Sequence, residues 1–137
     1  AMITGGKGIH IVLNVKPSLN WEEFKSFASD VAEQIEALDP KRFIANMSKA
    51  KRKGRIFVDY LRNGRGATAI APYSPRARGT APVAVPVSWD ELKTIPGASV
   101  FKLKDMRARL NEPDPWADYA KSAVSITKAT RAKLGLD

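Results

Sequence analysis

Cysteine is absent from this chain of 137 residues. The absence excludes disulfide bonds, thiolate zinc sites and cysteine nucleophiles, and it is compatible with a reducing cytoplasm. No apolar run reaches the roughly 18 residues that span a membrane, and residues 1–8 lack the apolar segment of a secretory signal. The length suits one ordinary domain with its own core, so we expect residues 1–137 to form a single domain.

Acidic residues are scarce in the middle of the chain. Between Lys41 and Arg78, eleven basic residues accompany one acidic residue, Asp59, whereas the whole chain has a formal net charge of +9. The basic charge is therefore regional, which is typical of a surface that binds phosphates. A solvated basic face is the alternative interpretation. The basic residues are Lys41, Arg42, Lys49, Lys51, Arg52, Lys53, Arg55, Arg62, Arg65, Arg76 and Arg78.

Asp59 itself lies in an apolar run, residues 56–61, that favours a half-buried strand. A carboxylate in such a strand costs free energy unless a cation compensates it. Two interpretations stay open. The carboxylate either forms a structural ion pair with Arg55 or Arg62, or it binds a divalent metal at a site that handles phosphates.

Apolar periodicity predicts a strand at residues 9–15 and a helix at residues 21–38. Asn20, with Glu23 three residues later, forms a typical helix-capping pair. Two further strands, residues 55–61 and 66–72, are expected to form a hairpin around Asn63-Gly64-Arg65-Gly66.

The second half is expected to begin with an ordered loop, residues 72–86, that leads to an edge strand. A helix that starts at Ser88, a short strand and turn within residues 99–110, and a helix over residues 115–133 follow. The last helix would dock through Trp116, Tyr119, Ala123 and Ile126. The order of elements predicts an α+β fold, an antiparallel-rich sheet with flanking helices.

A glycine-rich segment, Thr4-Gly5-Gly6-Lys7-Gly8-Ile9-His10, precedes the first predicted strand. It is not a Walker phosphate loop, because no serine or threonine follows the lysine. Its backbone amides suit an anion-binding nest, to which Lys7 adds a point charge. A hydrolase triad with His10 and Asp59 is a weak alternative, since no nucleophile-elbow motif is present.

Several motifs together resemble the polymerase domain of bacterial ligase D. That domain belongs to the archaeo-eukaryotic primase superfamily and serves non-homologous end joining. The resemblance covers essentially the whole chain. Its motifs are Thr4-Gly-Gly-Lys-Gly-Ile-His10, Phe57-Val-Asp59-Tyr-Leu-Arg-Asn63, Arg65-Gly-Ala-Thr-Ala69, Ala71-Pro-Tyr-Ser-Pro-Arg-Ala-Arg78, Trp89-Asp-Glu-Leu92 and Asp114-Pro-Trp-Ala-Asp118.

The resemblance implies a partial primase-polymerase (RRM-like) catalytic core and a role for each matching residue. Asp59 would bind Mg²⁺ or Mn²⁺ and, with His10, belong to the catalytic site. The triphosphate of the incoming nucleotide would be bound by Thr4, Lys7, His10, Arg52, Arg76 and Arg78. DNA ends and nucleoside triphosphates would be the ligands, and a ligase domain or Ku the protein partners. Two metal ions on carboxylates are the usual requirement of nucleotidyl transfer.

One family motif has no match, because the sequence contains no Asp-x-Asp pair. We therefore expect the chain to correspond to the C-terminal half of the polymerase domain. Alone it would bind Mg²⁺ or Mn²⁺ weakly or not at all and would be inactive without a complementing N-terminal fragment. An uncovered sheet edge would favour self-association, or partial disorder at residues 2–8. The alternative function is a non-catalytic module that binds DNA or nucleotide phosphates.

Overall fold

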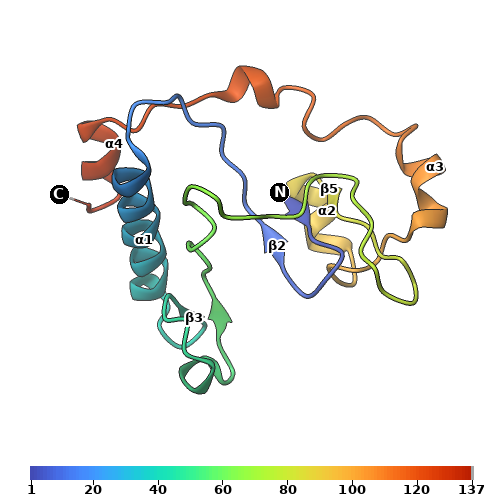
Figure 1. The fold of residues 1–137 in the computed structure, drawn as a ribbon, viewed down its shortest axis with the longest axis horizontal. Coiled ribbons are helices and arrows are strands. Elements are labelled where there is room, and N and C mark those ends of the chain that lie inside the picture. The colour runs from blue at the N-terminus through green and yellow to red at the C-terminus, as the bar shows by residue number, and fades with distance from the viewer. Residues whose placement is uncertain (137) are drawn as a thin grey trace. The chain divides into compact units, whose positions relative to one another are not determined.

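The computed structural model describes residues 1–136, which form two compact units (Figure 1). Unit 1 contains Ala1–Asn14 and Ile70–Val124, and unit 2 contains Val15–Ala69 and Ser125–Asp137. The assignment of residues 1–137 to a single domain stays a prediction.

Unit 1 is built on a three-stranded antiparallel sheet. Its strands are β1 (Met2–Ile3), β2 (Ile9–His10) and β5 (Val85–Pro86), in the order β2-β1-β5. Met2 lies opposite His10 on one side and Pro86 on the other. The expected edge strand after the loop at residues 72–86 is therefore present, although it begins before the loop was expected to end.

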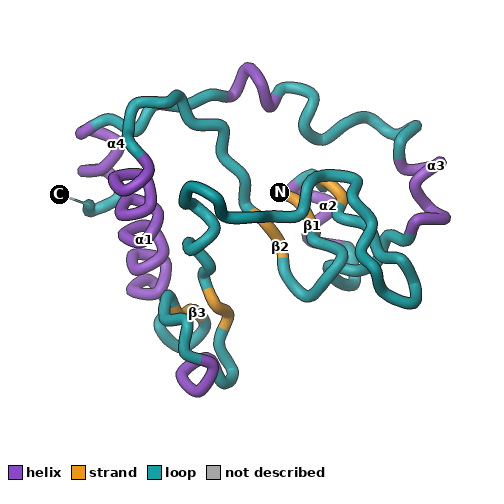
Figure 2. The backbone as a smooth tube through the Cα atoms, viewed as in Figure 1, coloured by secondary structure: helices purple, strands orange, loops and turns teal. Residues whose placement is uncertain are grey.

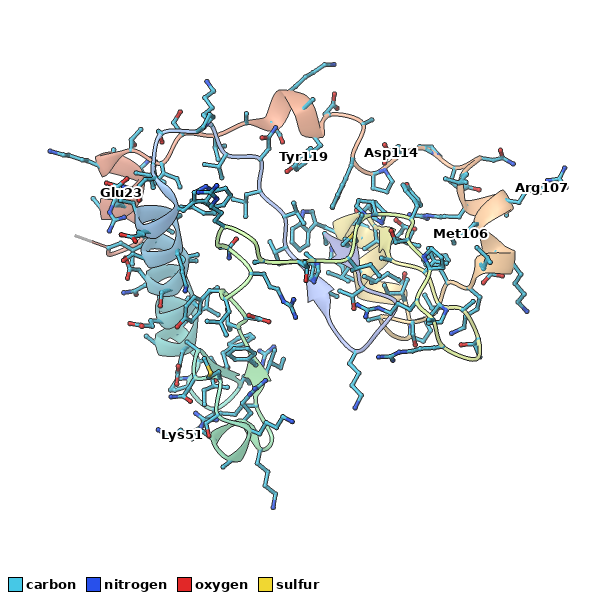
Figure 3. All side chains as sticks on the ribbon, viewed as in Figure 1. Glu23, Lys51, Met106, Arg107, Asp114 and Tyr119 are labelled. Carbon is cyan, nitrogen blue, oxygen red and sulfur yellow. The ribbon has the colours of Figure 1, made fainter. Side chains whose placement is uncertain are left out.

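The core of unit 1 forms around this sheet. Its buried members are Ile3, Val83, Val85, Val87 and Met106. Met106, labelled in Figure 3, belongs to α3 (Met106–Arg109), which follows the short turn η2 (Leu103–Asp105). Because the buried residues come from both ends of the unit's sequence, the core joins its two chain segments.

Residues after β5 form short helices rather than long ones. Ser88 caps α2 (Trp89–Thr94): its hydroxyl accepts from the Glu91 backbone N–H, and the Glu91 carboxylate accepts from the Ser88 N–H. The predicted helix start at Ser88 is confirmed. One further helical turn, η3 (Tyr119–Ser122), lies near the end of the unit.

Unit 2 contains α1 (Trp21–Leu38), the longest helix of the described residues (Figure 1). The predicted bounds and the Asn20–Glu23 capping pair are confirmed, since Asn20 Oδ1 accepts from the Glu22 and Glu23 backbone N–H groups and Glu23 accepts from the Asn20 N–H. Such a cap contributes about 1 kcal/mol.

The remaining elements of unit 2 are short. Strand β3 (Phe43–Ile44) pairs with β4 (Ile56–Phe57) in parallel, and η1 (Lys49–Arg52) lies between them in sequence. Near the end of the chain, α4 (Lys128–Lys133) completes the unit. Figure 2 shows that loops and turns occupy most of the chain outside α1.

The predicted hairpin around Asn63-Gly64 is wrong. A two-residue turn of that kind needs positive φ at both central residues, whereas only Gly66 has positive φ in this segment. Asn63 instead donates twice to the Tyr60 carbonyl, through its backbone N–H and its side chain. These local turns replace the second strand, and β4 pairs with β3.

Two other predicted elements are shorter than expected, each for its own reason. The strand at residues 9–15 is ordered as β2 only over Ile9–His10, since β1 offers two residues to pair with. The helix at residues 115–133 is interrupted because the Val124 N–H donates to the Asn14 carbonyl and Thr127 caps a new helix, α4. Trp116 and Tyr119 stack on each other, with ring centroids 5.4 Å apart.

The mixed composition of helices and strands, with an antiparallel sheet, confirms the α+β class. No helix within residues 1–136 combines the length and the apolar character that crossing a membrane requires.

A partly buried ion pair joins α2 and α3 in unit 1. The Arg109 guanidinium donates to both Glu91 carboxylate oxygens and to the Pro86 carbonyl, and lies 5.1 Å from the centre of the Phe101 ring. Only 9% of the Arg109 side chain is exposed. The hydrogen bond from Arg109 lowers the pKa of Glu91 below its ordinary value of 4.5. A carboxylate stabilised in this way contributes stability above pH 4.5 that is lost as the pH falls through its folded pKa.

We therefore expect Glu91→Gln to lower the free energy of unfolding at neutral pH by about 1–3 kcal/mol, since a hydrogen bond to a charged group is lost while the cap acceptor remains. The difference from the unchanged protein should shrink as the pH falls below 4.5. Urea denaturation at several pH values measures it. Asp90→Asn is the control, because its pair with Lys93 is exposed; an equal effect of both changes would contradict the expectation.

Candidate functional site

The glycine-rich segment of unit 1 forms a closed turn between β1 and β2. The Thr4 N–H and hydroxyl both donate to the Gly8 carbonyl, at 3.1 and 2.7 Å, and the Gly6 N–H donates to the Thr4 hydroxyl at 3.3 Å. Thr4 is buried, with 6% of its surface exposed. Its hydroxyl therefore shapes the turn from inside, while the backbone N–H groups of Lys7 and Gly8 donate to no described residue.

Two glycines make this turn sterically possible. Gly5 has φ +65°, and a Cβ there would lie 3.0 Å from the Val83 carbonyl carbon. A Cβ on Gly6 would lie 3.3 Å from the Thr4 hydroxyl and 3.6 Å from Arg76 Cζ. The turn thus packs against the buried residue Val83 at Gly5 and approaches the Arg76 guanidinium at Gly6.

Arg76 is held at the turn by its own side chain. Its Nε donates to the Thr4 carbonyl at 2.6 Å, and its backbone N–H donates to the Pro82 carbonyl at 2.8 Å. Its two terminal nitrogens form no hydrogen bond or ion pair with any residue the structure describes. A positioned guanidinium with free donors beside a glycine turn is a suitable arrangement for binding phosphate oxygens.

Three further predicted residues lie in unit 1. Lys7 is exposed on the turn, His10 is half-buried in β2, and Arg78 is exposed in the loop after Arg76. The Arg78 backbone N–H donates to the Arg76 carbonyl at 2.8 Å. Unit 1 therefore contains five of the predicted site residues: Thr4 and Lys7 on the turn, His10 in the strand that follows it, and Arg76 and Arg78 on one loop.

Asp59 belongs to unit 2, and its predicted setting is wrong. Strand β4 ends at Phe57, and the Asp59 side chain is 41% exposed rather than half-buried in a strand. Its Oδ1 accepts from the Leu61 N–H, and its Oδ2 lies 4.0 Å from Arg62 Nε. Of the two cations considered, Arg62 is the neighbour, whereas Arg55 pairs with Glu36 at 3.9 Å.

Arg52, also in unit 2, is fixed by local contacts. Its guanidinium donates to the Met47 carbonyl and lies 4.2 Å from the centre of the Phe57 ring. Its buried Nε has no hydrogen-bond partner in the described chain. Stacking on the Phe57 ring and a contact with the Met47 carbonyl hold the Arg52 guanidinium against β4.

Exposed lysines surround Arg52. Lys49, Lys51 and Lys53 come from η1 and the residue after it, all exposed, and Figure 3 labels Lys51 there. None of the ion pairs found within residues 1–136 involves these lysines. This lysine cluster, Lys49, Lys51 and Lys53, keeps its positive charge uncompensated.

The residues present do not by themselves fit a divalent metal. Within residues 1–136, no three histidine, aspartate or glutamate side chains gather in a group of the kind that holds a metal ion. Mg²⁺ and Mn²⁺ sites in nucleotidyl transfer use several carboxylate oxygens. Asp59 supplies one carboxylate, already turned toward Leu61 and Arg62.

Two residues in the same loop as Arg76 have a backbone conformation that the sequence did not predict. Tyr73 and Ala81 have positive φ, 59° and 41°, although neither is glycine. No sequence pattern marks a non-glycine residue for this conformation, so only the structure reveals it.

The family model described as "LigD, primase-polymerase domain" matches residues 1–116, and the chain belongs to this family.

Proteins with similar sequences support the family assignment. The chain is 44% identical over 135 residues to the multifunctional non-homologous end joining protein LigD of Pseudomonas aeruginosa, covering 96% of this chain and 16% of that protein. It is 26% identical over 122 residues to the bifunctional LigD of Bacillus subtilis, covering 88% of this chain and 20% of that protein. The chain thus spans less than a quarter of the length of either relative.

A solved structure shares the fold. The polymerase domain of Mycobacterium tuberculosis ligase D in complex with DNA matches with a TM-score of 0.64 and 28% sequence identity. The match covers 77% of this chain and 37% of the other. The predicted resemblance to the ligase D polymerase domain is confirmed.

The turn geometry gives a test of its own. Gly5→Ala should lower the free energy of unfolding by more than about 1 kcal/mol, since an L-residue in the left-handed region costs roughly 1–2 kcal/mol before the backbone contact is counted. Gly8→Ala is the matched control, because its added Cβ meets nothing within 4 Å and its φ is not left-handed. Thermal denaturation compares the two, and equal effects would show that the turn is not closed as described.

Proposed function

We propose that this chain is a nucleotidyltransferase module of bacterial DNA end joining. In it, the Thr4–Gly8 turn and Arg76 bind the triphosphate of an incoming nucleotide. The observation that carries the proposal is the hydrogen bond from Arg76 Nε to the Thr4 carbonyl. It places a guanidinium with free terminal donors beside a turn whose Gly6 leaves no side chain in between. Membership of the primase-polymerase family supports this assignment.

Each proposed residue has a role set by its place. Arg76 donates to phosphate oxygens, Lys7 adds a positive charge from the turn, and Arg78 adds another from the loop that carries Arg76. Thr4 holds the turn in shape, and His10, in β2, is the proposed catalytic residue beside it. Positive charge fixed around a transferring phosphoryl group stabilises its transition state, which is the largest catalytic contribution expected here.

In unit 2, Asp59 and Arg52 are the proposed residues. We assign Asp59 the role of one metal-binding carboxylate, and Arg52 that of an additional phosphate-binding cation. Because a single carboxylate does not make a site for two hard cations, Mg²⁺ or Mn²⁺ should bind weakly to this chain alone. We therefore propose that the chain alone does not extend DNA primers and that additional protein segments, together with a ligase domain or Ku, complete the activity.

Calorimetric titration with a nucleoside triphosphate, with and without Mn²⁺, tests the proposal. Arg76→Ala should weaken binding about tenfold or more, since it removes charge-assisted hydrogen bonds. Arg107→Ala is the matched control: it makes the same charge change in unit 1 at an exposed residue of α3 (Figure 3), and binding should stay within about twofold.

The metal dependence separates the roles of the two units. Binding that requires Mn²⁺ and is lost in both Asp59→Ala and Arg76→Ala would support both assignments. Binding that is independent of metal and lost only in Arg76→Ala would remove the role of Asp59. If the unchanged chain binds no triphosphate, the proposed function is wrong.

A second candidate function is non-catalytic binding of DNA phosphates. The lysine cluster favours it, because its three side chains are exposed and have no acidic partners among the described residues. DNA phosphates bound by lysine release counterions, so binding should weaken steeply with salt.

If the lysine cluster binds DNA phosphates, removing its charges should make DNA binding less dependent on salt. Changing Lys49, Lys51 and Lys53 to Gln should reduce the slope of log affinity against log salt by about 0.9 for each duplex phosphate contact removed. Fluorescence anisotropy with a short duplex at several salt concentrations measures the slope. The control changes Lys104, Lys128 and Lys133 to Gln, which alters the net charge equally. If both triple variants change the slope alike, the lysine cluster is not a DNA site.

We propose that the chain self-associates through the β2 edge of the unit 1 sheet. The sheet of unit 1 ends at β2, and the residues from Ile9 onward expose apolar side chains: Ile9, Ile11, Val12 and Leu13. Strand edges that expose apolar side chains pair readily with another chain. The alternative of partial disorder at residues 2–8 finds no support, because Met2 and Ile3 are buried in the central strand.

A further inference from the structure

Two strained residues flank the arginine of the proposed triphosphate site. Within residues 1–136, Tyr73 and Ala81 are the non-glycine residues with positive φ, and Arg76 lies between them in sequence. A side chain in the left-handed region costs about 1–3 kcal/mol unless the surroundings impose it. Such strain collects at positions where the chain must hold a functional group in place. The same loop thus carries the strain and Arg76.

A ladder of hydrogen bonds fixes the segment from Tyr73 to Arg76. The Tyr73 N–H donates to the Ala84 carbonyl at 2.7 Å, and the Ala84 N–H returns to the Ser74 carbonyl at 3.0 Å. Pro75 pairs with Val83, and the Arg76 N–H donates to the Pro82 carbonyl at 2.8 Å. The segment therefore lies antiparallel to residues 82–84, which are buried in the core of unit 1.

The Tyr73 side chain sets the start of this ladder. It is partly buried and packs against the core cluster of unit 1. Burial and the nearby Asp114 carboxylate raise the pKa of its hydroxyl. With its side chain packed against the core cluster and its N–H bonded to the Ala84 carbonyl, Tyr73 has little freedom to leave the left-handed conformation. The direction of the chain toward Arg76 follows from that conformation.

Ala81 holds the far end of the same loop. Its N–H donates to the Arg78 carbonyl at 2.7 Å, and its carbonyl accepts from the Leu103 N–H at 3.0 Å. Residues 77–80 between the two ends are exposed. The loop is thus fixed where it leaves and rejoins the buried segment, and Arg76 lies near its first fixed end.

We propose that Tyr73 is the positioning residue for Arg76. Its ring, packed against the core cluster, imposes the left-handed turn that sets the ladder register and aims the Arg76 guanidinium at the Thr4 carbonyl. This inference rests on the proposed function only in giving Arg76 a ligand. The positioning itself is a property of the chain without nucleotide.

The Arg76 Nε–H proton reports the positioning directly. Arg76 Nε lies 2.6 Å from the Thr4 carbonyl oxygen, to which it donates this proton. The NMR signal of the proton should therefore be shifted downfield, and the proton should be protected from solvent exchange in the nucleotide-free protein. Arg76→Lys, which lacks this group, assigns the signal. A residue with a purely structural role would change the stability without moving this signal in the folded state.

Two substitutions separate the ring from the backbone. Tyr73→Phe keeps the ring and should leave the Arg76 signal and the triphosphate affinity unchanged. In Tyr73→Asn, the asparagine tolerates positive φ but lacks the aromatic ring. It should remove the exchange protection of the Arg76 signal and weaken triphosphate binding about tenfold, the effect of losing one charge-assisted hydrogen bond.

Two outcomes would overturn the proposal: an unchanged Arg76 signal in Tyr73→Asn, or a loss in Tyr73→Phe as large as that in Tyr73→Asn. The methyl signals of Val83 and Val85 show whether each variant is folded. If Tyr73→Asn does not fold, Tyr73→Leu replaces it, since leucine keeps an apolar side chain on the core but not the ring. The same loss of the Arg76 signal is then expected, and an unchanged signal again overturns the proposal.

This design separates the inference from the proposed function. Absence of triphosphate binding by the unchanged protein would refute the proposed function and leave the Arg76 signal as the test of Tyr73. Conversely, normal triphosphate binding with an unchanged Arg76 signal in Tyr73→Asn would refute the inference alone.

Discussion

The burial of residues 82–87 is the constraint on which unit 1 depends. These residues lose nearly all contact with solvent, so each of their backbone polar groups needs a partner within the protein. The partners come from three directions: β1 pairs with β5, residues 73–76 pair with 82–84, and the Val83 N–H donates to the Phe101 carbonyl. One buried segment thereby fixes the sheet, the loop that carries Arg76 and the chain that leads to α3.

The candidate site is a by-product of this packing. Ile3 is buried against the same segment, and the chain must turn back at once because β2 pairs with β1 on its other side. The turn takes the Thr4–Gly8 form since Gly5 must pass close to Val83. Arg76, arriving from the ladder on residues 82–84, meets the turn at the Thr4 carbonyl. Site and core therefore share the same hydrogen-bonded framework.

Unit 2 distributes its charge differently. Four of its acidic residues pair with arginines: Asp30 with Arg131, Glu36 with Arg55, Asp39 with Arg42, and Asp59 with Arg62. The lysine cluster retains uncompensated charge, and Arg52 is held against Phe57. In unit 2, paired arginines maintain local structure while unpaired lysines give the surface its positive potential.

The sequence by itself determined the features that depend on neighbouring residues. The α1 helix, its Asn20 cap and the Ser88 cap were all predictable, because capping and helical periodicity act over a few residues. The candidate site residues of unit 1 could be proposed from two short motifs, and their roles stay a proposal.

Tertiary structure decided what depends on distant partners. Whether residues 9–15 or 66–72 become strands depends on the strand available to pair with them. The hairpin that Asn63-Gly64 predicts does not form, and β4 pairs with β3 instead. The exposure of Asp59, the internal use of the Thr4 hydroxyl and the strain at Tyr73 likewise follow from contacts far apart in sequence. Local sequence sets the conformations that the chain prefers, but burial and hydrogen-bond partners select among them.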